Sequence, residues 1–286
     1  ALMLPIGVSV LVLLEEQELA PAHSRNFALA LLLGIAFGAN IGGMATLIGT
    51  PPNALLAGYL AEQHGIRIGF VQWMAVGLPA ALLLLLACWW VLCRRVFPLP
   101  SQQIEGIEAL IGRQRAALGA MSVPERRVGL VFAAVALAWL GRPLLELLLP
   151  GAGLSDPGIA VLGSLLLFLI PAGGGFAGGL LQWESTRDLP WGVLVLVGGG
   201  LSLGTAITAS GLSAAVVVGL GDLEVWPLWT VVGLVGLVAM LLSHVTSNTA
   251  TAATLLPLAA ALALKLGQSP LLLTVPVALA ASCAFM

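Results

Sequence analysis

The chain has 286 residues, of which 59% are hydrophobic and only 8% are charged, whereas soluble globular domains carry about 25% charged residues. So few charges cannot cover a soluble fold of this size, and a net charge of −2 gives no reason to expect a nucleic-acid partner. The three cysteines, Cys88, Cys93 and Cys283, have the spacing of neither a metal site nor a disulfide framework. The composition therefore predicts an integral membrane protein embedded in a lipid bilayer.

The first third of the chain consists of short apolar segments separated by polar residues and prolines. Residues 1–14 end at two glutamates, residues 26–39 end at Asn-Ile-Gly-Gly, and residues 54–61 follow Pro-Pro-Asn. Apolar segments of about 10–14 residues are too short to cross the hydrocarbon core as helices. Non-helical backbone at membrane depth is tolerated only where protein or a water-filled cavity satisfies it. We therefore expect re-entrant or broken helices here, followed by a full span over residues 70–93.

A basic segment follows this span and fixes the expected orientation. Six of the eleven Lys and Arg residues lie within it: Arg94, Arg95, Arg113, Arg115, Arg126 and Arg127. Positively charged loops stay in the cytoplasm, so residues 94–127 are expected there. Within this loop, residues 104–121 have helical spacing, which fits an amphipathic helix on the inner membrane surface or a solvated linker helix equally well.

The remaining apolar segments predict three full crossings and a hairpin. Residues 129–149, 158–176 and 191–220 are long enough to span the membrane, and residues 226–242 are of borderline length. Three crossings would leave the chain outside, so the final third would enter from the face opposite to the first. Because Leu4-Pro5 and Leu256-Pro257 stand in matching contexts, we interpret the two thirds as an inverted repeat. Substrate and ion sites of secondary transporters lie where such repeats meet.

The predicted organisation is that of an all-α, multi-pass protein of the cell inner (plasma) membrane. Residues 1–93 would hold one arm of a first re-entrant hairpin, a broken helix and a span, and residues 128–222 would hold three scaffold-type spans. Residues 223–286 would form a second hairpin and the start of a second broken helix. The repeat also predicts Ser-Asn-Thr before Ala1 and Thr-Pro-Pro-Asn after Met286, so we expect the chain to be cut at both ends.

Three runs of residues carry a family resemblance. Residues 42–53 read Gly-Gly-Met-Ala-Thr-Leu-Ile-Gly-Thr-Pro-Pro-Asn, residues 247–252 read Ser-Asn-Thr-Ala-Thr-Ala, and residues 281–286 read Ala-Ser-Cys-Ala-Phe-Met. These runs resemble motifs of the divalent anion:sodium symporter family. The resemblance covers essentially the whole chain, with the motifs in the same order. The resemblance implies a homodimer that carries a small dianion, a C4-dicarboxylate or sulfate, together with Na⁺ by an elevator movement. A related arsenite or citrate permease, or a dicarboxylate exchanger, is the alternative.

The resemblance also implies roles for particular residues. Five would face the substrate: Thr50, Pro51, Ser247, Asn248 and Thr249. Gly49 would serve a first sodium ion, and a second would be bound by Ser243, Thr246 and Asn248.

The chemistry of these residues suits such roles. The Asn248 side chain offers both a donor and an acceptor, so it can contact an anion and a cation at once. Ser247 and Thr50 stand where they would cap helices, whose N-termini present free N–H groups and partial positive charge to an anion. Gly42, Gly43 and Gly49 permit close backbone approach. Each motif also has a simpler interpretation, as an ordinary loop between helices or as a helix cap at the membrane surface. The glycines at 198–200 fit close helix packing better than ion binding.

The titratable residues bear on the coupling ion. Proton-coupled carriers usually place Asp, Glu or His within the membrane, yet the mid-membrane segments hold no Asp or Glu. His244 could be a proton site, but we interpret it as a packed polar residue beside the hairpin tip. Helix N-termini supply only about half a charge each, so bound sodium ions, more than one per dianion, are expected to offset the substrate charge. A channel would need no paired inverted hairpins, and no His/Asp/Glu cluster supports an enzyme.

Overall fold

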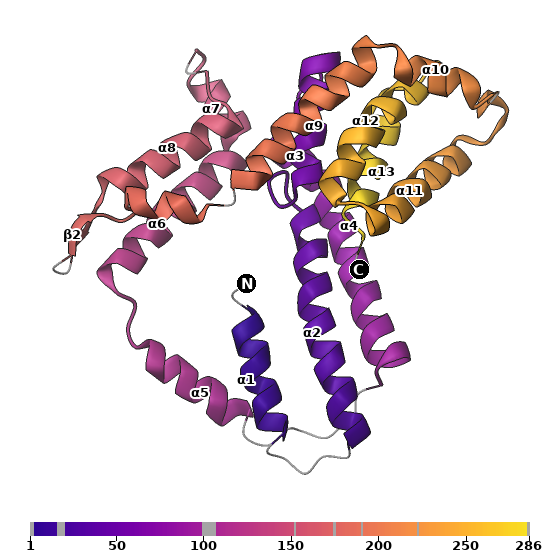
Figure 1. The fold of residues 1–286 in the computed structure, drawn as a ribbon. Coiled ribbons are helices and arrows are strands. Elements are labelled where there is room, and N and C mark those ends of the chain that lie inside the picture. The colour runs from indigo at the N-terminus through magenta and orange to yellow at the C-terminus, as the bar shows by residue number, and fades with distance from the viewer. Residues whose placement is uncertain are drawn as a thin grey trace.

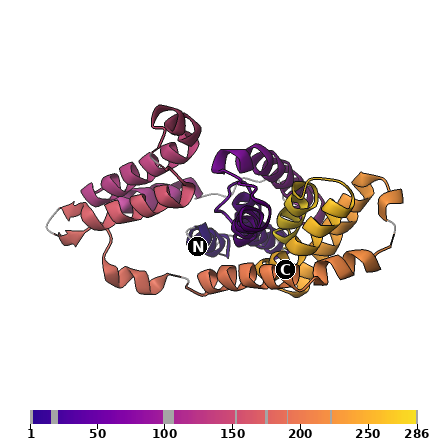
Figure 2. The same cartoon turned by 90° about the horizontal axis from the view of Figure 1, so that it is seen from above.

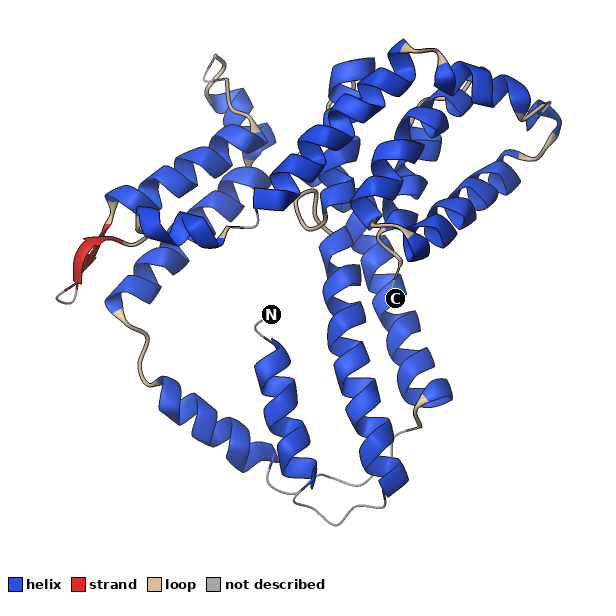
Figure 3. Cartoon of the chain, in the orientation of Figure 1, coloured by secondary structure: helices blue, strands red, loops and turns tan. Residues whose placement is uncertain are grey.

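The computed structural model describes residues 3–15, 21–98, 107–151, 153–173, 176–189, 191–221 and 223–284. These residues are almost entirely helical apart from one short antiparallel hairpin, β1 (Pro171–Gly173) with β2 (Phe176–Gly179), as Figure 3 shows. Four of the described helices are long and apolar enough to cross a membrane: Ser24–Met44, Phe70–Val96, Trp191–Ala209 and Leu228–Val245. The prediction of an all-α membrane protein is thereby confirmed.

The N-terminal helices are α1 (Met3–Glu15), α2 (Pro21–Met44), α3 (Pro51–His64) and α4 (Phe70–Trp90), and α4 continues as a π-helix to Val96. The prediction that the second apolar segment ends near residue 39 is wrong, because α2 continues to Met44. A helical glycine costs only about 1 kcal/mol, so Gly42 and Gly43 do not end a helix that its neighbours favour. Residues 45–50 form the non-helical break, and α3 is the predicted short helix.

The basic loop contains α5 (Ile107–Leu118), which confirms a helix within the predicted 104–121 segment. Residues 104–106 lie outside the described part of the chain. The side chains at 115–118 are exposed, and α5 contacts α1.

The first two of the three crossings predicted after the loop are not single unbroken helices. Residues 129–149 form α6 (Val123–Leu140) and α7 (Arg142–Leu148), which are bent by 75° against each other. Pro143 in the first turn of α7 lacks an N–H to continue the helix. The next helix, α8 (Asp156–Leu169), has 14 residues and ends before Pro171, which is short for a span. The number of crossings after the loop, and with it the opposite entry of the final third, stays a prediction.

The C-terminal half contains α9 (Trp191–Ala209), α10 (Leu212–Gly219), α11 (Leu228–Val245), α12 (Asn248–Lys265) and α13 (Leu271–Ala281). The predicted segment 191–220 is broken between α9 and α10, where Gly211 has φ +75°, a conformation that suits glycine. Only Thr246 and Ser247 separate α11 from α12, so these helices form a tight hairpin with its tip at these two residues.

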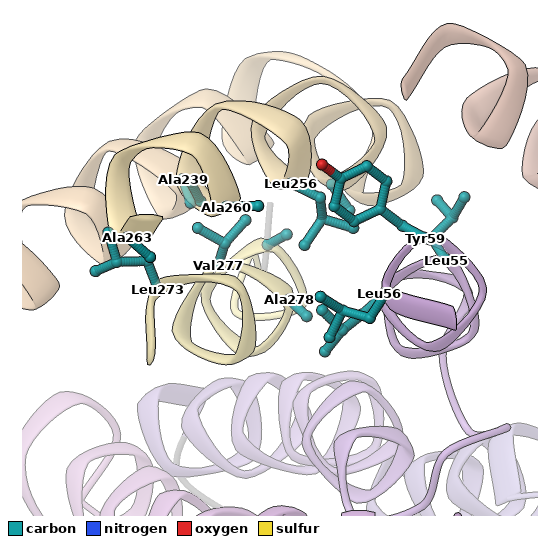
Figure 4. Close-up of a cluster of buried hydrophobic side chains, with 14 of the residues drawn as sticks. Leu55, Leu56, Tyr59, Ala239, Leu256, Ala260, Ala263, Leu273, Val277 and Ala278 are labelled. Carbon is teal, nitrogen blue, oxygen red and sulfur yellow. The ribbon is translucent and has the colours of Figure 1, made fainter. Parts of the chain in front are cut away.

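The core lies where α3 packs against the C-terminal helices. In Figure 4, Leu55, Leu56 and Tyr59 of α3 point towards α12 and α13. Helix α9 packs closely on α12 and α3, because a Cβ atom on Gly200 would stand 3.0 Å from Ala253 Cβ and from Leu55 Cδ2. This agrees with the interpretation of the Gly-rich run as packing, although only Gly200 of the three glycines makes such a contact.

A second group of helices, α6 to α8, stands apart from this core (Figures 1 and 2). Its main packing on the rest of the described chain is that of α6 on α4. The two groups are thus joined over a small area, at the N-terminus of α4 near Phe70.

Candidate functional site

The break between α2 and α3 folds back onto the end of α2. A Cβ atom on Gly49 would overlap the Gly43 carbonyl oxygen, and a Cβ atom on Gly43 would lie 2.8 Å from the Gly49 carbonyl oxygen. The predicted close backbone approach is confirmed for these two glycines. It is wrong for Gly42, where a Cβ atom would meet open space.

Two side chains hold the break in place. Asn53 Nδ2 donates to the Thr46 carbonyl at 2.9 Å, and Trp73 Nε1 donates to the Met44 carbonyl at 2.9 Å. Asn53 is fully buried, and its Oδ1 has no hydrogen-bond partner among the described residues. An unpaired buried acceptor costs about 1–3 kcal/mol. Sequence reasoning did not select Asn53, although an amide directly after two prolines was the available signal.

The start of α3 differs from the prediction. Thr50 is the N-cap residue, but its hydroxyl accepts no hydrogen bond from the helix. The reason is local: Pro51 and Pro52 have no N–H, and the Asn53 N–H donates to the Thr50 carbonyl at 3.2 Å. The predicted hydroxyl cap and free first-turn N–H groups are therefore wrong at this helix. The Thr50 hydroxyl instead lies 3.3 Å from Ser282 Oγ, which also lies 3.2 Å from the Ala278 carbonyl oxygen.

The start of α12 matches the prediction. Ser247 is the N-cap, and its hydroxyl accepts from the Ala250 N–H at 3.1 Å. The N–H groups of Asn248 and Thr249 occupy the first two helical positions, which have no partner within an α-helix. Thr249 is buried. This helix end therefore keeps donors and a partial positive charge directed out of its first turn.

A cluster of oxygen atoms lies beside the hairpin tip. Ser243 Oγ stands 2.8 Å from Asn248 Oδ1 and 2.6 Å from the Ala281 carbonyl oxygen. One hydroxyl carries one proton, so it cannot donate to both acceptors. Either the Asn248 amide turns its Nδ2 towards Ser243, or a cation supplies the missing positive charge. Ser243 is 3% exposed, which makes an unbalanced set of oxygens costly.

No hydrogen bond described for Thr246 joins it to this cluster. Its hydroxyl bonds with Leu242 O at 3.0 Å and with Thr251 Oγ1 at 2.6 Å. His244 Nδ1 contacts the Met240 carbonyl of its own helix at 2.7 Å, which agrees with a packed polar residue.

The end of α13 joins the hairpin to the break. Ala281 contacts Ser243 of the hairpin, and the next residue, Ser282, contacts Thr50 of the break. Cys283 then packs its Sγ 4.0 Å from Met44 Sδ. Sequence reasoning missed Ala281 and Ser282 as site residues, although both lie in the run that carried the resemblance. None of the hydrogen bonds described for this cluster involves a charged side chain.

Comparison with known proteins agrees with this arrangement. The family described as "Citrate transporter" matches residues 1–283. The sodium-dependent dicarboxylate transporter SdcS of Staphylococcus aureus strain USA300 is 39% identical over 293 residues, and so is that of strain NCTC 8325 / PS 47. Each match covers 100% of this chain and 56% of the relative. The chain thus spans about half the length of the curated relatives it matches.

The match extends over nearly the whole chain, including both polar motifs and the end of α13. It agrees with the resemblance to divalent anion:sodium symporters, and with the prediction of a multi-pass plasma-membrane protein that is not an enzyme. The chain belongs to the citrate transporter family of membrane carriers.

Proposed function

We propose that the chain is the greater part of a sodium-coupled carrier of small divalent anions, with C4-dicarboxylates such as succinate or malate as substrates. The observation that carries this proposal is the meeting of three interrupted segments: the break at Thr50, the start of α12 at Asn248 beside the hairpin tip, and the end of α13 at Ala281 and Ser282. Interrupted helices meeting inside a membrane protein are the usual place for substrate and ion sites. The dicarboxylate named for SdcS supports this substrate class.

Sodium fits the Ser243 cluster. Hydroxyl, amide and carbonyl oxygens are hard ligands, and the three oxygens have a single hydroxyl proton between them. We assign the second sodium ion to Ser243 and Asn248, with the Ala281 carbonyl as an added ligand. Thr246, whose hydroxyl bonds with Thr251, stays a proposed ligand of this ion as predicted. Gly49, pressed against the Gly43 carbonyl, is the proposed ligand of the first ion.

The anion is expected between the two N-termini. At α12, Ser247, Asn248 and Thr249 offer hydroxyls, an amide and first-turn N–H groups. At α3, Pro51 and Pro52 have no N–H groups to donate to the anion. The Thr50 hydroxyl and the positive end of the helix dipole are the groups that would attract it there. Pro51 would contribute shape rather than a hydrogen bond, because it has no N–H.

The two groups of helices suggest how such a carrier would work. We propose that α1–α4 and α11–α13, which build the site, form a transport domain together with α9, which was predicted as a scaffold-type span but packs on α3 and α12. Helices α6–α8 would belong to a scaffold. Movement of the first group past the second would expose the site to each side in turn, as in an elevator mechanism. We propose a homodimer for the assembly, as the resemblance implies.

Uptake by the intact carrier in liposomes tests the proposal. Labelled succinate uptake should rise more steeply than linearly with external sodium, because more than one cation is needed to offset two negative charges. A pH gradient in sodium-free buffer should drive no uptake. Parallel assays with sulfate and citrate define the substrate class.

Succinate uptake that proceeds fully without sodium, driven by the pH gradient, would contradict sodium coupling and redirect attention to His244. Uptake of citrate but not succinate under a sodium gradient would instead favour the citrate-type alternative. Equal rates of exchange with and without sodium would favour an exchanger.

A further inference from the structure

One carboxylate joins the first residues of three helices at the contact between the two helix groups. Asp156 begins α8, Phe70 begins α4 and Arg142 begins α7. Asp156 Oδ2 accepts from the Phe70 N–H at 3.1 Å, and Asp156 Oδ1 lies 3.0 Å from Arg142 Nη1. The carboxylate therefore places its charge at the N-termini of α4 and α8, where a negative charge is stabilised.

An aromatic contact accompanies this bond. The Phe70 ring stacks on Trp139 of α6 with centroids 5.1 Å apart and planes 19° apart. Trp139 Nε1 also donates to the Asp156 carbonyl at 3.0 Å. Phe70 is thus held by a carboxylate from α8 and an indole from α6, which are both in the proposed scaffold.

These residues line one side of a cavity of about 950 Å³ between the two groups. Leu47 and Ile48 of the break and Gly58 of α3 line the same cavity. Outside the Phe70 contact, the α6–α8 group therefore lies across this cavity from α3 and the break. A contact this small between bodies of this size suits an interface that opens.

We propose that Asp156, Arg142, Trp139 and Phe70 form a latch that holds the transport domain against the scaffold in one state and must open in each transport cycle. This inference rests on the proposed function. In it, Asp156 is a positioning residue that acts on the relative placement of the two domains. It does not touch the substrate. A carrier that moves α4 past α8 cannot keep the Phe70–Asp156 bond through the movement.

Chemical bridging of the latch is the direct test. In an intact carrier with Cys88, Cys93 and Cys283 replaced by alanine, Phe70→Cys and Trp139→Cys provide two thiols at the stacking position. Both substitutions keep Asp156, Arg142 and the N–H of residue 70. Bridging the pair with a short bifunctional thiol reagent should lower sodium-driven uptake at least tenfold, and reduction should restore it. Full uptake by the bridged carrier would overturn the latch and show a permanent junction.

A second measurement follows the population of the latched state through the rate of bridging itself. Asp156→Asn, which keeps an acceptor oxygen but loses the charge, should slow bridging about tenfold, because charge-assisted bonds are the stronger ones. Glu146→Gln is the matched control: it removes a carboxylate that pairs with Arg142 at 2.8 Å but lies on the same helix and does not reach α4. It should change the bridging rate less than twofold. Equal rates in Asp156→Asn and the parent would overturn the role of Asp156.

The two measurements separate this inference from the proposed function. If the unbridged double-cysteine carrier and its parent both lack sodium-driven uptake, the proposed function fails, while the bridging rates still report on the latch. If uptake is present and bridging leaves it unchanged, the latch alone fails.

Discussion

Replacing Asn248 with alanine in the intact carrier is expected to lower uptake on the order of 100-fold while leaving membrane insertion unchanged. Asn248 Oδ1 lies 2.8 Å from Ser243 Oγ, and its N–H lies in the first turn of α12. The substitution removes a side chain that we place between the anion and a sodium ion. Losing a partner of a charged group costs about 1.5–3 kcal/mol. Because the two ligands share one residue, both affinities should fall together.

Thr254→Ala serves as the matched control for Asn248→Ala. Thr254 lies on the same helix, is exposed, and bonds only with the Ala250 carbonyl of its own helix among the contacts described. It should transport at close to the parent rate. Binding of succinate and of sodium is measured in detergent for both variants, with surface expression as the check on insertion. An Asn248→Ala carrier with parental uptake would show that the hairpin tip has been assigned wrongly.

Gly49→Ala is the second substitution with a large expected effect. The added methyl would overlap the Gly43 carbonyl oxygen and approach Thr46 Oγ1 to 2.8 Å. Gly43 lies in the last turn of α2 and Thr46 lies in the break, and the Met44 and Thr46 carbonyls are already held by Trp73 and Asn53. Overpacking of this kind typically costs about 1–3 kcal/mol, and the displaced loop carries a proposed sodium ligand. We expect at least a tenfold loss of uptake and a lower melting temperature.

Gly42→Ala is the control, seven residues away. A methyl group at this position of α2 meets open space, and alanine favours a helix by about 1 kcal/mol over glycine. Uptake should be unchanged and the melting temperature equal or higher. If Gly42→Ala and Gly49→Ala lose uptake equally, the effect cannot come from the contact with Gly43.

The features that could be predicted from the sequence are those encoded locally. Ser247 caps α12 because a hydroxyl directly before a helix can accept a hydrogen bond from an N–H of the first turn that has no partner within the helix. The break before α3 follows from Pro51 and Pro52, which cannot continue a helix that is already running. The membrane class follows from composition alone.

The structure differs from the sequence-based expectation where an apolar run does not form one unbroken helix. The apolar run 158–176 continues past the end of α8, but Pro171 removes the N–H that another turn would need. The same holds for Pro143 at the bend between α6 and α7. At Gly42 and Gly43 the error was the opposite, since glycine lowers helix stability without ending the helix.

Other features depend on the tertiary structure and left little signal in the sequence. The Ala281 contribution is a backbone carbonyl, which every residue possesses, so residue type could not mark it. Asp156 and Phe70 are 86 positions apart, and neither lies in a motif. The contact of the Thr50 hydroxyl with Ser282, 232 positions later, likewise joins two residues that no local pattern connects.

That last separation has a consequence for the biogenesis of the protein. At about 5–20 residues per second, the ribosome needs roughly 10–50 s to make the 232 residues between Thr50 and Ser282. During that time the break at 45–50 has already been made, while its partner from α13 does not yet exist. Unpaired backbone groups exposed to lipid cost several kcal/mol each, so the backbone of the break must find its partners within the part of the chain that has already been made.

The contacts of Asn53 and Trp73 provide such partners. The bonds from Asn53 to Thr46 and from Trp73 to Met44 need nothing beyond residue 73. The Gly49 N–H is likewise satisfied locally, by the Thr46 carbonyl at 3.2 Å. The break can thus fold early as a self-contained unit, and the contact between the Thr50 hydroxyl and Ser282 forms later, once α13 has been made. Variants of Trp73 should consequently harm synthesis and insertion of the carrier, whereas variants of Ser282 should insert normally and fail only in transport.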